Sequence, residues 1–234
     1  MLLDKKGNEK VEVMAIIFFL LLMIICVGMV YFVHKFFGKE QFYLLGIIYS
    51  IVSFIMSFKL INIMGVNINA NVIFSSGLLL ILYYFVKRYN AKESKKFIFT
   101  VIVSNLFCIF YFLLSSFMVP SIYDKMSVFY KNMIFDNLAI VILYPVSLAV
   151  TLFLSEYCFR ELNKEDENNT IKMILTILGI MFIDNAIFIY FSYAFIIRFD
   201  TAIGIAIDNY LIKTAIMIIY TFIANKLFKV KKVK

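Results

Sequence analysis

Two ionisable side chains lie inside long apolar segments in the second half of the chain. Asp184 interrupts the run GIMFIDNAIFIY, with Asn185 beside it, and Lys213 interrupts the run NYLIKTAIMIIY. A carboxylate accepts hydrogen bonds and an ammonium group donates them, so the two groups can bind each other or hold a polar ligand. Asp208 lies five residues before Lys213, off the i,i+4 face of a helix. The preferred partner of Lys213 is therefore Asp184.

The segments that carry these groups are apolar enough for a membrane. The chain has 234 residues, is 63% hydrophobic and has a mean hydropathy of +0.93, whereas about 45–50% of an ordinary globular domain is apolar. Only two prolines and eight glycines interrupt it, which favours long helices with short connections. We expect an all-α fold, a polytopic integral membrane helical bundle.

Apolar runs of about 18 residues or more predict seven transmembrane helices. They cover residues 13–36, 42–64, 70–87, 97–118, 136–158, 171–197 and 202–226. The first is an extra N-terminal span after a polar tail (1–12), and residues 37–228 form a six-helix membrane domain followed by a basic tail (229–234). The amphipathic segment 121–133 is expected to lie at the membrane surface.

The basic residues orient the predicted bundle. Of the 23 Lys and Arg residues, 15 fall in tails and connections on one side of the spans, seven fall on the other, and Lys213 lies inside a span. The positive-inside rule then places the N-terminus outside and the C-terminus in the cytoplasm, which needs an odd number of spans. The chain has a net charge of +8, and its basic residues cluster between the apolar runs. The expected partner is therefore the lipid bilayer of the cell membrane and not nucleic acid.

Motifs for other kinds of chemistry are missing from the sequence. It contains no HExxH zinc motif, no GxSxG nucleophile motif and no P-loop, so we do not expect an enzyme. Cys26, Cys108 and Cys158 lack the CxxC spacing of a metal or redox site. No metal and no cofactor is therefore expected.

Asp184 and Lys213 are expected to lie deep in the membrane, where a charged group indicates a partner or a functional site. A charged side chain near the bilayer centre costs about 2.5–3.5 kcal/mol on insertion scales, so it usually faces a partner or a cavity. Spans six and seven are joined by a few residues, so they should be antiparallel neighbours with Asp184 and Lys213 at similar depth. Such a pair either fixes the register of two helices or forms a substrate or proton site. We favour the second interpretation and keep the first as its alternative.

Amide side chains form weaker candidates. The segment INIMGVNINANVIF carries four asparagines between spans two and three. It is either an ordinary loop or an amide-lined pocket at the outer end of the bundle, to which Asn71 contributes. Asn105 in span four predicts a hydrogen bond between helices, worth about 0.6 kcal/mol in membranes.

Five segments, in their order and spacing, resemble the queuosine-precursor transporter family, also described as putative vitamin-uptake transporters. They are FFGKEQFY (36–43), FKLINIMGVNINANVIF (58–74), RYNAKESKK (88–96), FIDNAIFIYFSYAF (182–195) and NYLIKTAI (209–216). The last resembles the family's Tyr-Leu-(Val/Ile)-Lys signature, and the resemblance runs from about residue 36 to 228. It implies a six-helix carrier core in which Lys59, Asp184, Tyr210 and Lys213 match family positions.

Several polar positions of that family carry other residues in this chain. Tyr83 and Lys87 replace two acidic residues of the family. Ala149 replaces a Gln, Leu152 an Asp and Met181 another Gln. The late Asp-Thr-Pro of the family is replaced by Tyr220, Thr221 and Phe222. The scaffold is thus retained more fully than the polar lining.

The resemblance implies a membrane transporter that imports a small, flat, polar heterocycle, such as a queuosine precursor of the deazaguanine type or a vitamin-like compound. Asp184 would accept ring N–H donors, Asn185 would set orientation, and Tyr210 would stack or donate a hydrogen bond. Lys59 and Asn71 complete the candidate substrate-binding set. Transport would be facilitated, ion-coupled or driven by an energy-coupling partner, and a homo-oligomer stays open.

Besides a membrane enzyme, which is the weakest alternative, two other functions stay open. One is the substrate-binding subunit of an energy-coupled vitamin importer. Such subunits dock through small residues four apart, for which Ala202 and Ala206 are the candidates. The other is a non-transporting membrane protein built on a carrier scaffold, which the lost polar positions favour.

Overall fold

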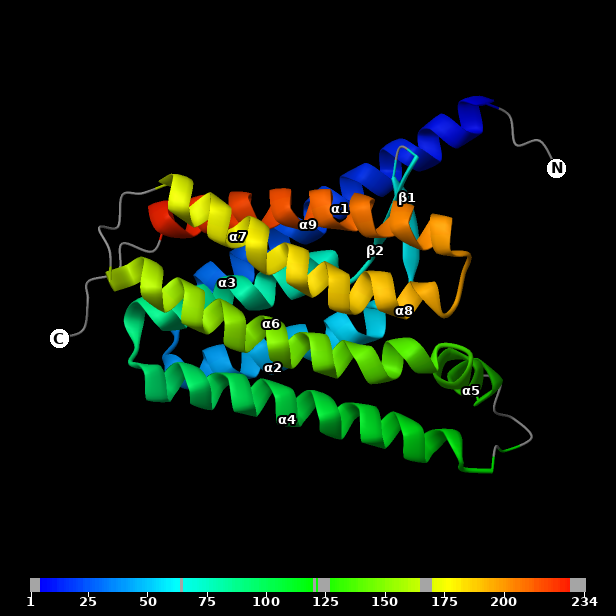
Figure 1. Cartoon of the computed structure of the whole chain (residues 1–234), viewed down its shortest axis with the longest axis horizontal. Helices are drawn as coiled ribbons and strands as arrows, with labels where there is room; N and C mark the ends of the chain where they lie inside the picture. The colour runs from blue at the N-terminus through cyan, green and yellow to red at the C-terminus, as the bar shows by residue number, and fades with distance from the viewer. Residues whose placement is uncertain (1–4, 64, 120, 122–126, 165–169, 228–234) are drawn as a thin grey trace.

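The computed structural model describes residues 5–227 except 64, 120, 122–126 and 165–169. It confirms an all-α membrane bundle with one small β-hairpin (Figure 1). The long helices are α1 (Lys5–Phe36), α2 (Lys39–Met56), α3 (Val72–Arg88), α4 (Ala91–Ser116), α6 (Leu138–Lys164), α7 (Thr170–Asn185) and α9 (Phe199–Leu227). Shorter elements are α5 (Ser127–Phe135), the π-helix η1 (Ala186–Tyr190), α8 (Phe191–Ala194), and strands β1 (Leu60–Ile63) and β2 (Val66–Asn69).

Six stretches of the described residues are long and apolar enough to cross a membrane. They are Val13–Phe36, Lys39–Met56, Ala91–Ser116, Leu138–Asn163, Thr170–Ala194 and Phe199–Lys226. The protein is therefore a multi-pass membrane protein. The predicted span 70–87 coincides with α3, whose 17 residues sit at the lower limit for crossing the hydrocarbon.

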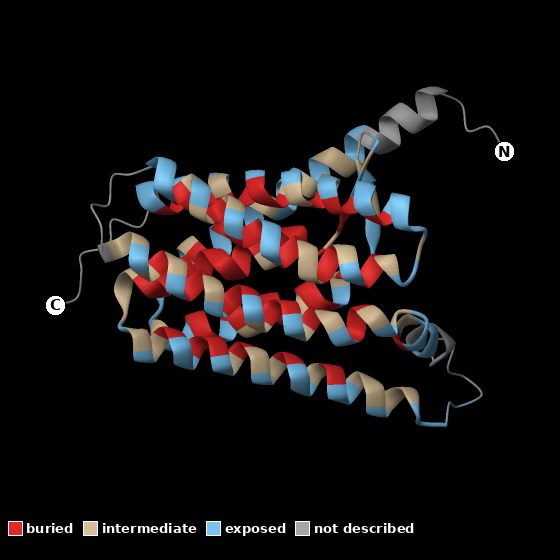
Figure 2. Cartoon of the chain, in the orientation of Figure 1, coloured by how far each residue is buried: buried red, intermediate tan, exposed pale blue. Residues whose placement is uncertain are grey.

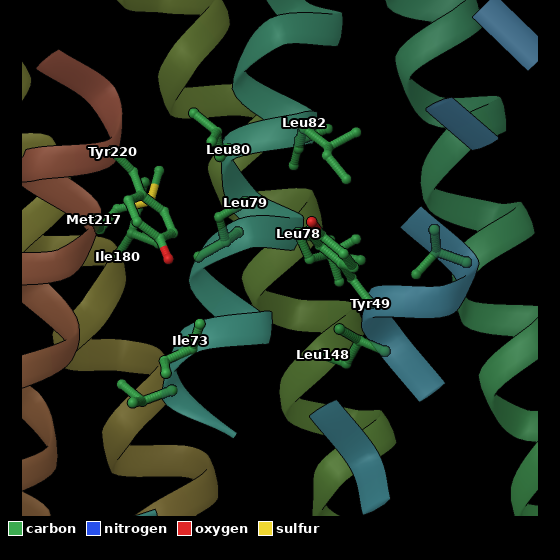
Figure 3. Close-up of a cluster of buried hydrophobic side chains, with 14 of the residues drawn as sticks. Tyr49, Ile73, Leu78, Leu79, Leu80, Leu82, Leu148, Ile180, Met217 and Tyr220 are labelled. Carbon is green, nitrogen blue, oxygen red and sulfur yellow. The ribbon is translucent and has the colours of Figure 1, made fainter. Parts of the chain in front are cut away.

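Helix α3 forms the centre of the bundle. Nearly every residue from Val72 to Val86 is buried, and Figure 2 shows this helix as an almost continuous buried segment. A helix that is apolar on all sides is stable only when other helices surround it. Figure 3 shows its leucines among side chains of α2, α6, α7 and α9, with Tyr49, Leu148, Ile180, Met217 and Tyr220 around Leu78, Leu79, Leu80 and Leu82.

The predicted second span (42–64) is wrong from residue 57 onward. Helix α2 ends at Met56, and the chain then forms an antiparallel hairpin in which Leu60 pairs with Asn69 and Ile63 with Val66. Asparagine alternates with β-branched residues in both strands, a spacing typical of strands, and Gly65 adopts a φ of +84° in the turn. A glycine takes this backbone conformation without steric cost, so the hairpin turns here.

The predicted sixth span (171–197) is confirmed in extent but is not one regular helix. Helix α7 ends at Asn185, directly after Asp184, and continues as the π-helix η1 and the short helix α8. A π-helix widens the turn by one residue and often marks a functional site. The irregular turn therefore begins beside the ionisable residue of this span.

The bundle has two distinct ends. Helices α1, α3, α6 and α9 finish at the end where α2, α4 and α7 begin, and the hairpin, α5 and α8 lie at the other (Figure 1). The side with 15 basic residues corresponds to the first of these ends as far as the chain is described. The surface segment predicted at 121–133 falls partly on α5, while 122–126 and the basic tail (229–234) lie outside the described residues. The N-terminal tail expected at 1–12 is helical from Lys5 onward.

Candidate functional site

The two ionisable groups inside the spans face each other across α7 and α9. Lys213 Nζ lies 2.5 Å from Asp184 Oδ2, and the two side chains are 4% and 9% exposed, respectively. Both residues lie near the middle of their spans, and α7 and α9 are packed neighbours. The predicted pairing of Asp184 with Lys213 is confirmed, and neither group faces lipid.

Helix α6 supplies two hydroxyl groups to the same carboxylate. Thr151 Oγ1 donates to Asp184 Oδ1 over 2.8 Å, and Ser147 Oγ donates to this atom over 3.0 Å. The two residues are one helical turn apart on α6, so their side chains reach the carboxylate from the same face. Both Asp184 oxygens are thus occupied, one by the ammonium group and one by hydroxyls, which offsets part of the cost of burying the charge.

Asn185 belongs to a second set of hydrogen bonds that begins beside the ion pair. Its Nδ2 donates to the Ala206 carbonyl over 2.6 Å, and its Oδ1 accepts from Asn209 Nδ2 over 2.9 Å. Asn209 Oδ1 accepts in turn from the backbone N–H of Asn69 over 3.1 Å. A continuous line of amides therefore connects α7, through α9, to the hairpin.

The hairpin is fixed to the rest of the protein through two asparagines of its second strand, β2. Asn67 N donates to Asp208 Oδ2 over 2.9 Å, so Asp208 serves the hairpin and not Lys213. The buried Asn69 donates through Nδ2 to Tyr193 Oη and to the Ser57 carbonyl, each over 2.7 Å. Because α9 provides both Asp208 and Asn209, the position of the hairpin and the position of α9 depend on each other.

An apolar groove opens beside the ion pair on the outer side of α7, η1 and α9. Its volume is about 350 Å³, and Asn185, Phe182, Tyr190 and Tyr210 contribute to its lining. The Phe182 and Tyr210 rings meet edge to face at 6.2 Å, and Tyr210 Oη reaches the Leu178 carbonyl over 3.5 Å. Tyr210 thus lies on the groove side of α9, and Asn185 belongs to both the groove and the buried network.

The structure does not bring the other predicted site residues to this place. Asn71 is buried where α3 begins, and its backbone N–H donates to Asn69 Oδ1 over 2.9 Å, while no hydrogen-bond partner for its Oδ1 lies in the described chain. Lys59 is exposed and lines two cavities at the hairpin end, neither of which includes Asp184. Asn105 makes the predicted bond between helices, to the Ser50 carbonyl of α2 over 3.1 Å.

Sequence reasoning missed Ser147, Thr151 and Asn209. In α6 the polar residues Ser147, Thr151 and Ser155 recur every fourth position, which places them on one face of a helix. That spacing was a usable signal for the hydroxyls. Asn209 had no comparable signal, because its role depends on a hairpin that lies 140 residues earlier.

The described residues contain no cluster of three His, Cys, Asp or Glu side chains that would hold a metal ion. The site consists of a buried ion pair, whose two charges balance, with hydroxyl and amide groups around it. No protein-family model, curated protein or solved structure matches this chain.

Proposed function

We propose that this protein is a membrane carrier that imports a small polar heterocycle of the deazaguanine or vitamin type. The observation that carries the proposal is the buried Asp184–Lys213 pair with its hydroxyl donors. Ionisable residues inside membrane spans most often mark the path of a substrate or proton, and carriers commonly bind their cargo near the middle of the membrane.

In this mechanism the Asp184 carboxylate exchanges partners. A planar ring with N–H donors takes the place of the Thr151 and Ser147 hydroxyls on Oδ1, while Lys213 stays on Oδ2. The cargo is neutral, because the ion pair already balances its own charge. The π-helix after Asn185 supports this proposal, since π-helical turns within helices are frequent at functional sites.

Uptake of a labelled deazaguanine base into cells or proteoliposomes tests the proposal. Asp184→Asn and Lys213→Met are each expected to reduce uptake by about tenfold or more, because each leaves the other group without its charged partner. The matched control is Lys39→Met, which removes an ion pair to Glu93 whose two side chains are 32% and 26% exposed. Undiminished uptake in both buried-pair variants would exclude the site.

The alternative of an energy-coupled importer loses its suggested docking pair. Ala202 and Ala206 are 0% and 9% exposed, so this pair offers little surface to a partner subunit. A docking surface elsewhere would be detected by co-purification of ATPase subunits with the tagged protein.

A non-transporting membrane protein is the second candidate, and one observation favours it. Both Asp184 oxygens are satisfied by side chains of the protein itself, as expected for a pair that only fixes helix register. The two candidates differ in the double variant Asp184→Asn with Lys213→Met. A structural pair predicts that this variant regains stability and whatever activity the protein has, whereas a binding site predicts regained stability without uptake.

A further inference from the structure

Lys59 stands between two cavities at the hairpin end of the bundle. The larger, of about 760 Å³, lies between the end of α2, the start of β1, α4 and the junction of α5 with α6. The smaller, of about 330 Å³, lies between α1, the hairpin and α3. Met56 and Lys59 line both, and neither cavity includes Asp184 or Lys213. These cavities are therefore separate from the buried ion pair.

The larger cavity combines two opposite charges with apolar walls. Lys59 and Asp136 line it together with the amides Asn132 and Asn137. Within the part of the chain that the structure describes, neither the Lys59 ammonium nor the Asp136 carboxylate has an ion-pair partner. The remaining lining is apolar and includes Ile55, Phe58, Leu60, Phe112 and Met133. A cation and an anion that line one cavity, with no ion-pair partner among the described residues, offer two charged contacts to one ligand.

The backbone around these two charges is held in place. Lys59 N donates to the Met56 carbonyl over 3.1 Å, and Ala70 N donates to the Lys59 carbonyl over 2.9 Å. On the other wall, Asp136 N donates to the Asn132 carbonyl over 3.0 Å. The hairpin and α5 thus fix the backbone from which each charged side chain extends.

We propose that the Lys59–Asp136 cavity binds a zwitterion with an apolar body. Its anionic group lies at Lys59 Nζ, its ammonium group at the Asp136 carboxylate, and its apolar part against Phe112 and the end of α2. A volume of about 760 Å³ is typical of small-molecule sites. The second cavity, which shares Met56 and Lys59 with the first, is lined mainly by apolar side chains of α1, the hairpin and α3.

Two sources carry this chemistry, and the experiment separates them. One is a free apolar amino acid, with L-phenylalanine as the probe, measured by equilibrium binding to the purified full-length protein. The other is a lipid headgroup, with phosphatidylethanolamine as the probe, measured by native mass spectrometry after extraction from nanodiscs. This proposal is independent of the import function, because neither measurement involves uptake.

Lys59→Met and Asp136→Asn are each expected to weaken binding of the bound probe by about tenfold or more, since each removes a charged hydrogen-bonding group. Lys131→Met and Asp200→Asn are the matched controls, because they remove exposed charges at the same end that line neither cavity. Both test residues are exposed, so melting temperatures should stay unchanged.

Binding of either probe that depends on both charges supports the proposal and identifies the source. Dependence on Lys59 alone contradicts it, because the site would then recognise an anion and not a zwitterion. The proposal is also overturned when wild-type protein binds neither probe, or when both variants bind as well as the wild type.

Discussion

Asp184, in the last turn of α7, and Lys213, in the middle of α9, form an ion pair of 2.5 Å. The pair is closed on its other side by Thr151 and Ser147 of α6, so three helices meet at a single carboxylate. Lipid is as apolar as the protein interior, so helices in a membrane associate through packing and through polar contacts of this kind. The pair therefore joins α6, α7 and α9 into one packing unit.

A double-mutant cycle on this pair should give a large coupling energy. Asp184→Asn and Lys213→Met are each expected to destabilise the protein by about 3–5 kcal/mol, because each leaves an uncompensated buried charge. The double variant should be more stable than either single variant. Reversible unfolding in mixed micelles measures the free energies, and additive single effects would contradict the pairing.

The Ser147 and Thr151 hydroxyls of α6 should contribute measurably to the free energy of unfolding, but less than the ion pair does. Thr151→Val keeps the shape of the side chain and removes one donor to Asp184, with an expected loss of about 1–3 kcal/mol. Ser155→Ala is the control in the same helix, since no hydrogen-bond partner for the Ser155 hydroxyl lies in the described chain. This control should be neutral or slightly stabilising, and an equal loss in both variants would refute the role of Thr151.

Asn209 should hold the hairpin on the bundle. In Asn209→Leu the Asn69 N–H loses its acceptor, so the backbone amides of β2 should exchange with solvent faster, by the equivalent of about 1 kcal/mol or more. Asp208→Asn is the milder companion, because an amide oxygen still accepts from Asn67 N. Hydrogen exchange measured by mass spectrometry on residues 60–69 reports the difference, and unchanged exchange in Asn209→Leu would count against the connection.

Gly77 should tolerate no side chain. A Cβ atom there would lie 2.8 Å from a ring carbon of Tyr49 and would overlap Cys26 Sγ, so Gly77→Ala is expected to cost about 1–3 kcal/mol through overpacking. Adding Cys26→Ala should recover part of this loss. Gly179→Ala is the control, because no neighbouring atom lies within 4 Å of its Cβ position. Thermal unfolding in detergent compares the three variants.

The proposed orientation can be tested with single cysteines. In a background without the three native cysteines, Asn62→Cys in the hairpin should react with a membrane-impermeant thiol reagent in intact cells. Lys92→Cys at the start of α4 should react only after permeabilisation, because the basic end of the bundle is expected in the cytoplasm. Both positions are exposed. The reverse labelling pattern would invert the topology.

The sequence by itself determined the class of fold and the central pair. Long apolar runs identified the long helices, and the short connection between spans six and seven made Asp184 and Lys213 partners. Both inferences rest on signals that are local in the chain. The alternation of asparagine with isoleucine and valine in 61–68 was equally local. It was overlooked because the segment is apolar enough to extend a helix in a hydropathy average.

Only the tertiary structure decided which faces of the helices point inward. Lipid and protein interior are similarly apolar, so hydropathy does not distinguish a buried face from a lipid-facing one. The orientation of each helix about its own axis decides that Thr151 contacts Asp184 and that Asn209 contacts Asn69. It also places Tyr210 on the groove side of α9. The tertiary structure also separates Lys59 from the ion pair, because the connection between α2 and β1 that carries it lies beside α5 and not against α7 and α9.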